Sequence, residues 1–262
     1  MKLRSLFSSA LLTLAGLALS GSPAQAALVY SAGDLFLGFR GTGDSSDYLV
    51  NIGNVSQFAS LSPGSTVSVN TGGSISGDLS TAFSAGWFSR TDVFWSITGT
   101  TYDGTSNLVS TLYATRARSN ASVQSTPWTG RSNSGQIESV SLLQALAGKY
   151  VQDGSNSDTN ATKATFQDST ANNSYAKLTS ASSDFAIGGS VEGKPSAVLD
   201  FYRIDPVDSQ PASYLGYFTI DGSGAVTFTA VPEPSTVVLL GVSGALTMIF
   251  VRRRLKGGSA HS

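Results

Sequence analysis

The sequence contains no cysteine, and its only histidine is His261, next to the last residue. Without cysteine the chain can form no disulfide bond, thiolate metal site, iron–sulfur cluster or cysteine nucleophile. A Ser–His–Asp triad needs a histidine base, and a catalytic zinc ion usually needs histidine or cysteine ligands. We therefore expect no catalytic residue, no metal and no cofactor, and the sequence favours a protein that is not an enzyme.

Both ends of the chain carry patterns that are typical of targeting segments. At the N-terminus two basic residues precede an apolar stretch from Leu6 to Leu19, and the small residues Ala24 and Ala26 follow it. This pattern predicts a signal peptide over residues 1–26, which signal peptidase removes after Ala26. The alternative is an uncleaved membrane anchor, but the 14-residue apolar stretch is shorter than the roughly 17–25 residues of a membrane span.

The C-terminal segment combines a polar motif, an apolar stretch and a basic cluster. The motif Pro232-Glu233-Pro234 is followed by mostly apolar residues from Thr236 to Val251, and then by Arg252, Arg253 and Arg254. As a helix the apolar stretch is about 24 Å long, and snorkelling arginines with local thinning can match it to a bilayer core of roughly 30 Å. We predict a transmembrane helix with the arginines on the cytoplasmic side and the body outside. The alternative, a buried helix of the domain, fits poorly with the cations directly behind the apolar stretch.

Charged residues make up only 13% of the chain, and the net charge of the whole chain is −1. This value is misleading for the body, because the two terminal segments are basic. Six of the sixteen basic residues but only one of the seventeen acidic residues lie in the terminal segments, which leaves the body at residues 27–230 with a net charge of −6. Nucleic-acid binding depends on clustered Lys and Arg side chains. We therefore expect no nucleic-acid partner.

Short runs of aromatic and β-branched residues alternate with turn-forming residues throughout the body, which predicts a mainly-β domain. Predicted strands cover residues 28–30, 34–40, 48–52, 65–70, 92–98, 107–115, 197–204, 214–220 and 225–230. The Asp103-Gly104 and Asp221-Gly222 turns predict hairpins between the strands on either side of them. Many short strands with Gly-rich turns favour one antiparallel β-sandwich or jelly-roll-like domain.

One segment of the body breaks the strand pattern. Between Ile137 and Val151, apolar residues recur at spacings of three and four, which predicts one amphipathic helix with Ile137, Val140, Leu143, Ala147 and Tyr150 on its apolar face. Residues 153–183 are rich in Ser, Thr, Asn and Asp, and this composition predicts a long surface loop.

The body offers few patterns that point to chemistry. Trp128 is the candidate for a surface aromatic side chain that contacts a sugar. Residues 153–160 place oxygen-bearing side chains at alternate positions, as calcium loops do, but they lack the EF-hand glycine and the closing glutamate. Ser174 and Lys177 have a Ser-x-x-Lys spacing, which we interpret as a chance match. Two carboxylates can hydrolyse a glycoside without histidine, although the sequence places no such pair across a cleft.

The C-terminal segment resembles the PEP-CTERM sorting signal of Gram-negative bacteria, which is recognised by exosortase, an integral-membrane transpeptidase-like enzyme. The resemblance rests on Pro232, Glu233 and Pro234, with the apolar stretch and the arginine cluster behind them, and covers about 25 residues. It implies that residues 231–256 form the sorting signal and that exosortase cuts near the motif. The body, with Asp34–Arg40 near its start, is similar to cargo proteins of this class that have no assigned activity.

Three functions remain open on the sequence. The first is an exported surface or extracellular-matrix protein with a structural or adhesive role. The second is a module that binds exopolysaccharide through Trp128 and the polar stretch at residues 153–183. The third is a carboxylate-dependent glycosidase.

Overall fold

The structure, a computed structural model, describes residues 27–102, 110–154, 159–179, 184–208 and 210–231. The predicted signal peptide, the Asp103-Gly104 turn and the predicted transmembrane segment lie outside these residues. Among the described residues, no helix is long and apolar enough to cross a membrane.

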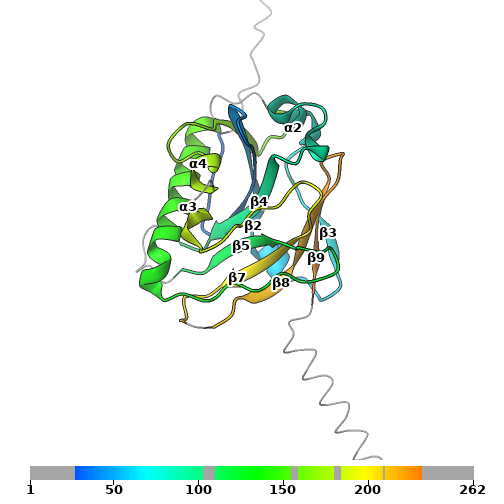
Figure 1. Cartoon of the computed structure of the whole chain (residues 1–262). Helices are drawn as coiled ribbons and strands as arrows, with labels where there is room; N and C mark the ends of the chain where they lie inside the picture. The colour runs from blue at the N-terminus through cyan, green and yellow to red at the C-terminus, as the bar shows by residue number, and fades with distance from the viewer. Residues whose placement is uncertain (1–26, 103–109, 155–158, 180–183, 209, 232–262) are drawn as a thin grey trace, which may run out of the picture.

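Nine strands form a single sheet in which every neighbouring pair is antiparallel (Figure 1). In spatial order they are β3 (Thr66–Ser68), β9 (Val226–Ala230), β8 (Ser213–Ile220), β7 (Leu199–Ile204), β5 (Leu112–Ala117), β4 (Val93–Thr100), β1 (Asp34–Gly41), β2 (Ser46–Asn54) and β6 (Ala164–Asp168). The prediction of a mainly-β, antiparallel domain is confirmed, as are the pairings of β4 with β5 and of β8 with β9.

The predicted strand at residues 28–30 is wrong, because this segment pairs with no strand. Its contacts are made by side chains. The amide Nδ2 of Asn51 donates a hydrogen bond to Val29 O (3.0 Å), and Leu28 packs so closely on Gly154 that a Cβ there would lie 2.3 Å from Leu28 Cδ1.

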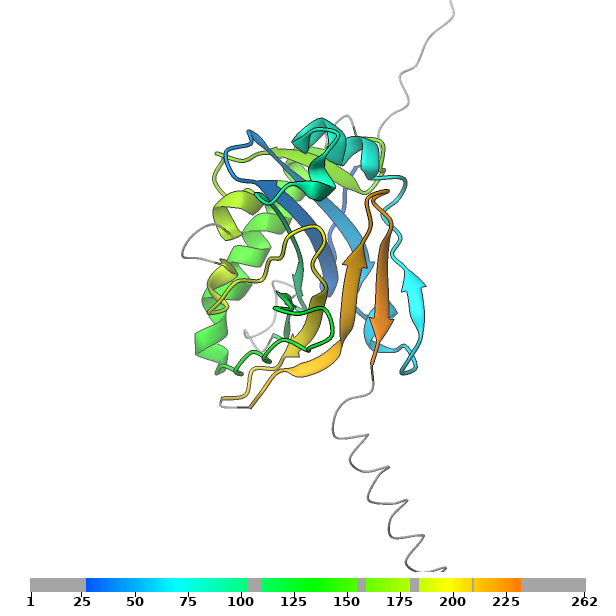
Figure 2. The same ribbon diagram turned by 45° about the vertical axis from the view of Figure 1, so that its right-hand side comes forward.

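The sheet is continuous and curled, and it is not the pair of separate sheets that a sandwich or jelly roll contains. β5 pairs with β7 along its whole length, so the strands after residue 197 extend the first half of the sheet. The register between β7 and β8 then shifts near Gly216 (φ 152°), where a Cβ would lie 2.2 Å from Thr229 O. Such a bulge bends and twists a strand, and beyond it β8 and β9 turn back toward β1 and β2 (Figure 2).

The inner face of the curl holds the larger of two apolar cores. Aromatic rings from both halves of the sheet meet there and are fully buried; they are Phe39, Trp95, Phe201, Phe218 and Phe228. Three short helical elements add to this core: α1 (Ser56–Ala59), α2 (Ser76–Phe83) and η1 (Trp87–Ser89) contribute Phe58, Leu79, Phe83 and Trp87.

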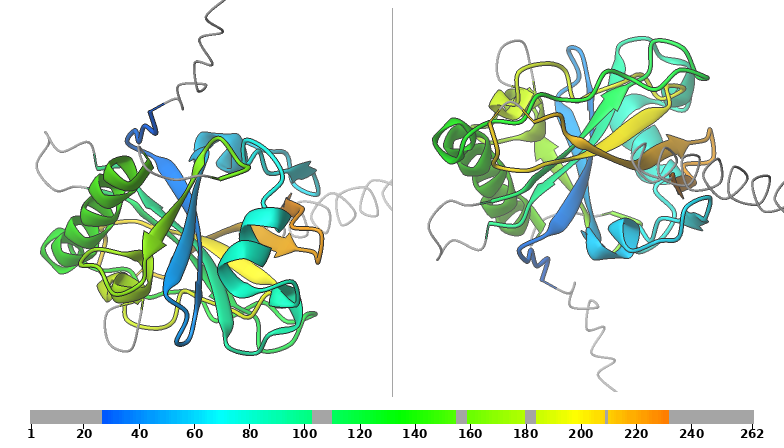
Figure 3. Two further views of the ribbon diagram at one scale, coloured as in Figure 1. Left: turned by 90° about the horizontal axis from the view of Figure 1, so that it is seen from above. Right: turned by 90° about the horizontal axis from the view of Figure 1, so that it is seen from below.

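The predicted amphipathic helix is confirmed as α3 (Asn133–Gly154), which lies on the outer face of the sheet. Its residues Val140, Leu143, Ala147 and Tyr150 are at most 4% exposed and share the second core with Phe36 of β1 and Leu49 of β2. Ile137, predicted on the same face, is 38% exposed. From above and below, α3 lies along one side of the sheet and the β8–β9 hairpin along the other (Figure 3).

The prediction of a surface loop over residues 153–183 is wrong, because this stretch contains β6 and the short helix α4 (Tyr175–Thr179). Several of its polar residues serve internal contacts. Thr165 and Gln167 are at most 1% exposed, and Gln167 Oε1 accepts a hydrogen bond from Tyr175 N at 3.0 Å. Composition alone therefore misidentified buried polar residues as solvated ones.

The segment that follows β3 contacts the segment that precedes β6. Thr162, just before β6, donates hydrogen bonds from its N–H (3.2 Å) and its hydroxyl (3.1 Å) to Gly72 O, beyond the end of β3. Beside them Asp78 of α2 is 2% exposed and accepts hydrogen bonds of 2.6–3.2 Å from Tyr48 OH and from three donors of residues 160–161. This carboxylate joins α2 to β2 and to the segment before β6.

Candidate functional site

The folded body ends where the predicted sorting motif begins. The N–H of Ala230, the last residue of β9, donates to Ser65 O (2.9 Å), and Ala230 O accepts from Gly64 N (2.8 Å). Val231 N donates to Leu215 O at 3.3 Å, and the residue after Val231 is the first proline of the motif. The motif itself, the arginine cluster and the signal-peptide cleavage residues lie outside the described residues.

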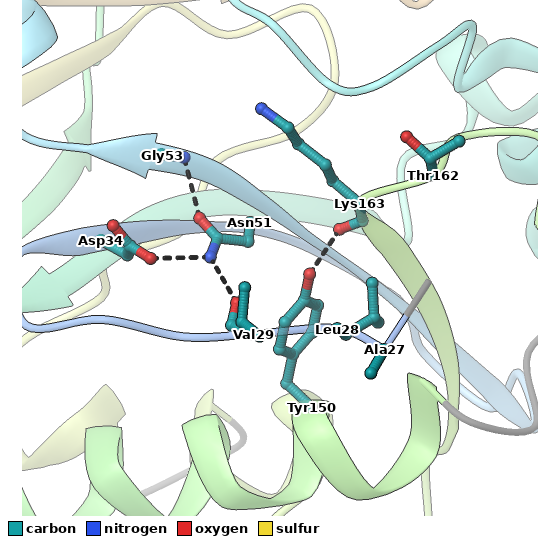
Figure 4. A pocket seen from close by; sticks show the side chains of 9 residues that line it. All are labelled: Ala27, Leu28, Val29, Asp34, Asn51, Gly53, Tyr150, Thr162 and Lys163. Carbon is teal, nitrogen blue, oxygen red and sulfur yellow. Dashed lines mark hydrogen bonds between the residues drawn. The ribbon is translucent and has the colours of Figure 1, made fainter. Parts of the chain in front are cut away.

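A cavity of about 240 Å³ lies beside the first described residues (Figure 4). It is lined by Ala27, Leu28, Val29, Asp34, Asn51, Gly53, Tyr150, Thr162 and Lys163. Asn51 lies at the centre of its polar contacts, because Nδ2 donates to Val29 O (3.0 Å) and Asp34 Oδ2 (2.9 Å) while Oδ1 accepts from Gly53 N (2.8 Å). The segment that follows the predicted cleavage after Ala26 is thus part of the folded body.

A second cavity of about 320 Å³ lies between residues 68–74 and 223–226. No ionisable side chain lines it, and the first cavity has one carboxyl group, that of Asp34. Neither cavity therefore has the two carboxyl groups that the glycosidase alternative requires.

Within the described ranges, no group of three or more His, Asp or Glu side chains is placed to hold a metal ion. Residues 155–158 of the calcium-like pattern lie outside those ranges. The Ser-x-x-Lys spacing has a structural explanation, because Ser174 Oγ accepts a hydrogen bond from Lys177 N (3.4 Å) and thereby caps α4.

Trp128 is buried, so the prediction of an exposed ring that contacts a sugar is wrong. Its side chain is 3% exposed, and the Arg116 guanidinium lies over the ring at 4.6 Å from the centroid. Gly189 approaches the ring from another part of the chain, since a Cβ there would lie 3.1 Å from Trp128 Cζ3. The exopolysaccharide-binding interpretation loses the aromatic residue on which it rested.

Ionisable side chains gather on the outer face of β1 and β2, beneath α4 and the turn η2 (Asp184–Ala186). Arg40 Nε donates to both carboxylate oxygens of Glu192 (3.0 and 2.9 Å), and Nη2 donates to Oε2 at 2.5 Å. The Glu192 side chain is 2% exposed. Next to this pair, Asp47 is fully buried: Oδ2 accepts from Ala176 N (2.7 Å), and Oδ1 has no hydrogen-bond partner among the described residues.

Burial has the largest effect on the pKa values of the carboxyl groups in this cluster. It raises the pKa of the Asp47 carboxyl to about 7, against the smaller opposing effects of Ala176 N–H and Arg40. Burial also raises the pKa of Glu192 and of Asp184, although the Arg40 guanidinium limits the rise at Glu192. The sequence gives no signal for this cluster, because Arg40 and Glu192 lie 152 residues apart.

Tyr175 of α4 fills the centre of the cluster because β1 has a glycine beneath it. The Tyr175 hydroxyl lies 2.7 Å from Ser96 Oγ, and a Cβ on Gly38 would lie 2.3 Å from Tyr175 Cε2. Gly38→Ala should displace this fully buried ring and lower the free energy of unfolding by about 1–3 kcal/mol in a denaturant titration. Gly86→Ala, where a Cβ meets nothing within 4 Å, is the control, and equal stability of the two variants contradicts the prediction.

Residues 230–254 match the family model of the PEP-CTERM protein-sorting motif. The match starts at the last residue of β9 and includes both the Pro-Glu-Pro sequence and the arginine cluster, so the predicted resemblance is confirmed. The chain carries a PEP-CTERM sorting motif. A PEP-CTERM motif implies export, processing by exosortase, and a membrane-anchored precursor that is delivered to the cell surface. No curated protein and no solved structure matches the chain.

Proposed function

We propose that residues 27–231 are the cargo of the PEP-CTERM motif and act at the cell surface or in the extracellular matrix, in a structural or adhesive role without catalysis. The observation that carries the proposal is the position of the motif, whose match begins at the last residue of β9. The nine strands that the described residues form all precede Pro232. A cut within or after the motif therefore leaves every strand pairing of the body intact.

In the precursor, the body is held close to the membrane. Only residues 232–235 separate Val231 from the start of the predicted span at Thr236. An extended chain advances at most about 3.6 Å per residue, so Val231 lies within about 18 Å of the span. Exosortase then meets the motif beside the end of the sheet, where Gly64, Ser65 and Leu215 hold the last residues of the body.

Two observations support a role without catalysis. The body has neither cysteine nor histidine, and neither of the two cavities described above has a pair of carboxyl groups. An exopolysaccharide partner is not part of the proposal, because Trp128 is covered by Arg116.

Glu233→Ala tests the sorting assignment in the native host. We expect the variant to remain full-length in the membrane fraction, whereas the wild type appears in the surface or extracellular fraction without its C-terminal segment. Fractionation followed by intact-mass measurement distinguishes the two forms, because the cleaved form has lost the residues from the motif onward.

Glu138→Ala is the matched control, since Glu138 is an exposed glutamate on α3. It should be processed and delivered like the wild type. If Glu233→Ala is shortened and released as efficiently as this control, Glu233 has no part in sorting and the proposal is wrong.

A further inference from the structure

A segment that we call the cap, residues 174–179 and 184–190, covers the outer face of β1, β2 and β4. It includes α4 and η2, and the chain returns to the sheet at Gly193, which exchanges backbone hydrogen bonds with Trp95 (2.9 and 3.0 Å). Tyr175 and Phe185, both fully buried, anchor it in the second apolar core. The cap is therefore a discrete element that is attached at defined points.

The backbone of the cap is strained at η2. Asp184, Phe185 and Ala186 have φ values of 32°, 53° and 53°, in the left-handed region that residues other than glycine rarely adopt. The contacts that hold this turn include the burial of Phe185, the hydrogen bond from Ile187 N to Asp184 O (3.1 Å), and a hydrogen bond that Arg131 Nη1 donates to Ala186 O. Local strain of this kind makes opening of the cap easier than unfolding of the sheet.

Carboxyl groups outnumber cations where the cap meets the sheet. Arg40 of β1 donates its side-chain hydrogen bonds to Glu192. Among the described residues, neither Asp47 of β2 nor Asp184 of η2 forms an ion pair. The other facing groups are the neutral Gln167 of β6, the hydroxyls of Ser174 and Tyr175, and Arg131, whose Nη1 contacts a backbone oxygen.

Asp47 is a carboxyl group whose ionisation is opposed by burial. It is fully buried, and its Oδ1 has no hydrogen-bond partner among the described residues. The Ala176 N–H at Oδ2, the Arg40 guanidinium and the Ser174 hydroxyl favour its negative charge, but burial outweighs them. Ala176 lies in the cap. The charge state of Asp47 therefore acts directly on the attachment of the cap.

We propose that the cap is a proton-controlled element, closed over β1, β2 and β4 while Asp47 is protonated and opening locally when Asp47 ionises. Opening uncovers the Arg40–Glu192 pair, the Ser96 hydroxyl and the apolar surface beneath Tyr175. An exported protein meets changes of external pH, and these would control access to that surface.

The direction of the pH effect follows from the cause of the shift. Burial raises the pKa of Asp47 from 3.8 to about 7, so closure favours the protonated form. The stabilisation of the closed cap is complete below the unshifted pKa and is lost as pH rises through about 7. Asp184 and Glu192, whose pKa values are raised in the same direction, add to the loss.

Amide hydrogen exchange of the protein recovered from the exported fraction tests the proposal at about pH 5 and about pH 9. Rates are divided by the intrinsic rate at each pH to give protection factors. We expect the protection of the Ala176, Leu178 and Ile187 amides to fall at least about tenfold between the two pH values, as the loss of more than one pKa unit of stabilisation implies. The amides of β8 and β9 should keep their protection.

Asp47→Asn keeps the shape of the side chain and cannot ionise, so its cap amides should lose clearly less protection than those of the wild type over the same range. The loss that remains is the share of Asp184 and Glu192. Asp208→Asn, at an exposed aspartate, is the control and should behave like the wild type. An equal fall in Asp47→Asn and the wild type overturns the proposal. Constant cap protection in the wild type, or a parallel loss in β8 and β9, overturns it without any variant.

Discussion

Asp78→Ala is expected to lower the free energy of unfolding by about 3–5 kcal/mol, measured by denaturant titration. Asp78 accepts hydrogen bonds from Tyr48 OH (2.6 Å), Asn160 N (2.8 Å), Asn160 Nδ2 (2.7 Å) and Ala161 N (3.2 Å). Alanine leaves all four donors without an acceptor in a region where Asp78 itself is 2% exposed. Each donor that stays buried without a hydrogen bond loses part of its hydration free energy. These losses together lower the free energy of unfolding.

The damage should concentrate around residues 160–161, because the Asp78 carboxylate joins them to α2 through three hydrogen bonds. Asp78→Asn keeps one accepting oxygen and should give an intermediate loss. Thr81→Ala, on the exposed side of the same helix, should change stability by less than about 0.5 kcal/mol. A loss in Asp78→Ala no larger than in Thr81→Ala would show that the carboxylate does not hold this junction together.

Asp200→Ala is expected to lower the free energy of unfolding by a similar amount, about 3–5 kcal/mol. Asp200 of β7 is fully buried and accepts from Arg118 Nε (2.9 Å), Tyr214 OH (2.8 Å) and Ser125 N (2.6 Å). The variant leaves the Arg118 guanidinium, 12% exposed, without its counter-ion. An uncompensated cation that stays largely buried is more destabilising than the loss of the ion pair's attraction alone.

The loss of Asp200 should also release the segment around Ser125, which crosses β7 and is held there by Asp200 and Tyr202. We expect the Ser125 amide to lose its protection from hydrogen exchange, while amides of β1 keep theirs. Asp205→Ala is the control, since its ion pair with Arg203 is 40% exposed on both sides and should contribute less than about 1 kcal/mol. Equal effects of the two substitutions would contradict the prediction.

Local sequence patterns predicted the elements whose defining contacts join residues that are close together in the sequence. The Asp221-Gly222 turn specifies the β8–β9 hairpin, because both partners lie within a few residues of it. The spacing of Val140, Leu143 and Ala147 specifies α3, because the same periodicity places them on one face of a helix. The sorting motif is also local, since it is a linear signal in residues 230–254.

Contacts between distant segments decided the rest of the fold. Whether nine strands form one sheet or two depends on the pairing of β5 with β7 and on the bulge at Gly216, which no local pattern encodes. Trp128 looked exposed because its neighbours in the sequence are polar, whereas Arg116 and Gly189 cover its ring in space. The polar residues 164–179 looked like a loop because composition cannot reveal that their hydrogen-bond partners lie inside the protein.

The sequence by itself determined where this protein is sent, because the sorting signal is a linear motif whose identity needs no tertiary contact. It also determined the mainly-β character of the body, since alternation of apolar residues acts over neighbouring positions. Only the tertiary structure decided that Arg40, Asp47, Tyr175 and Glu192 share one buried site. The physical reason is that burial from several strands and the cap shifts the pKa of Asp47, and this burial arises only after the chain has folded.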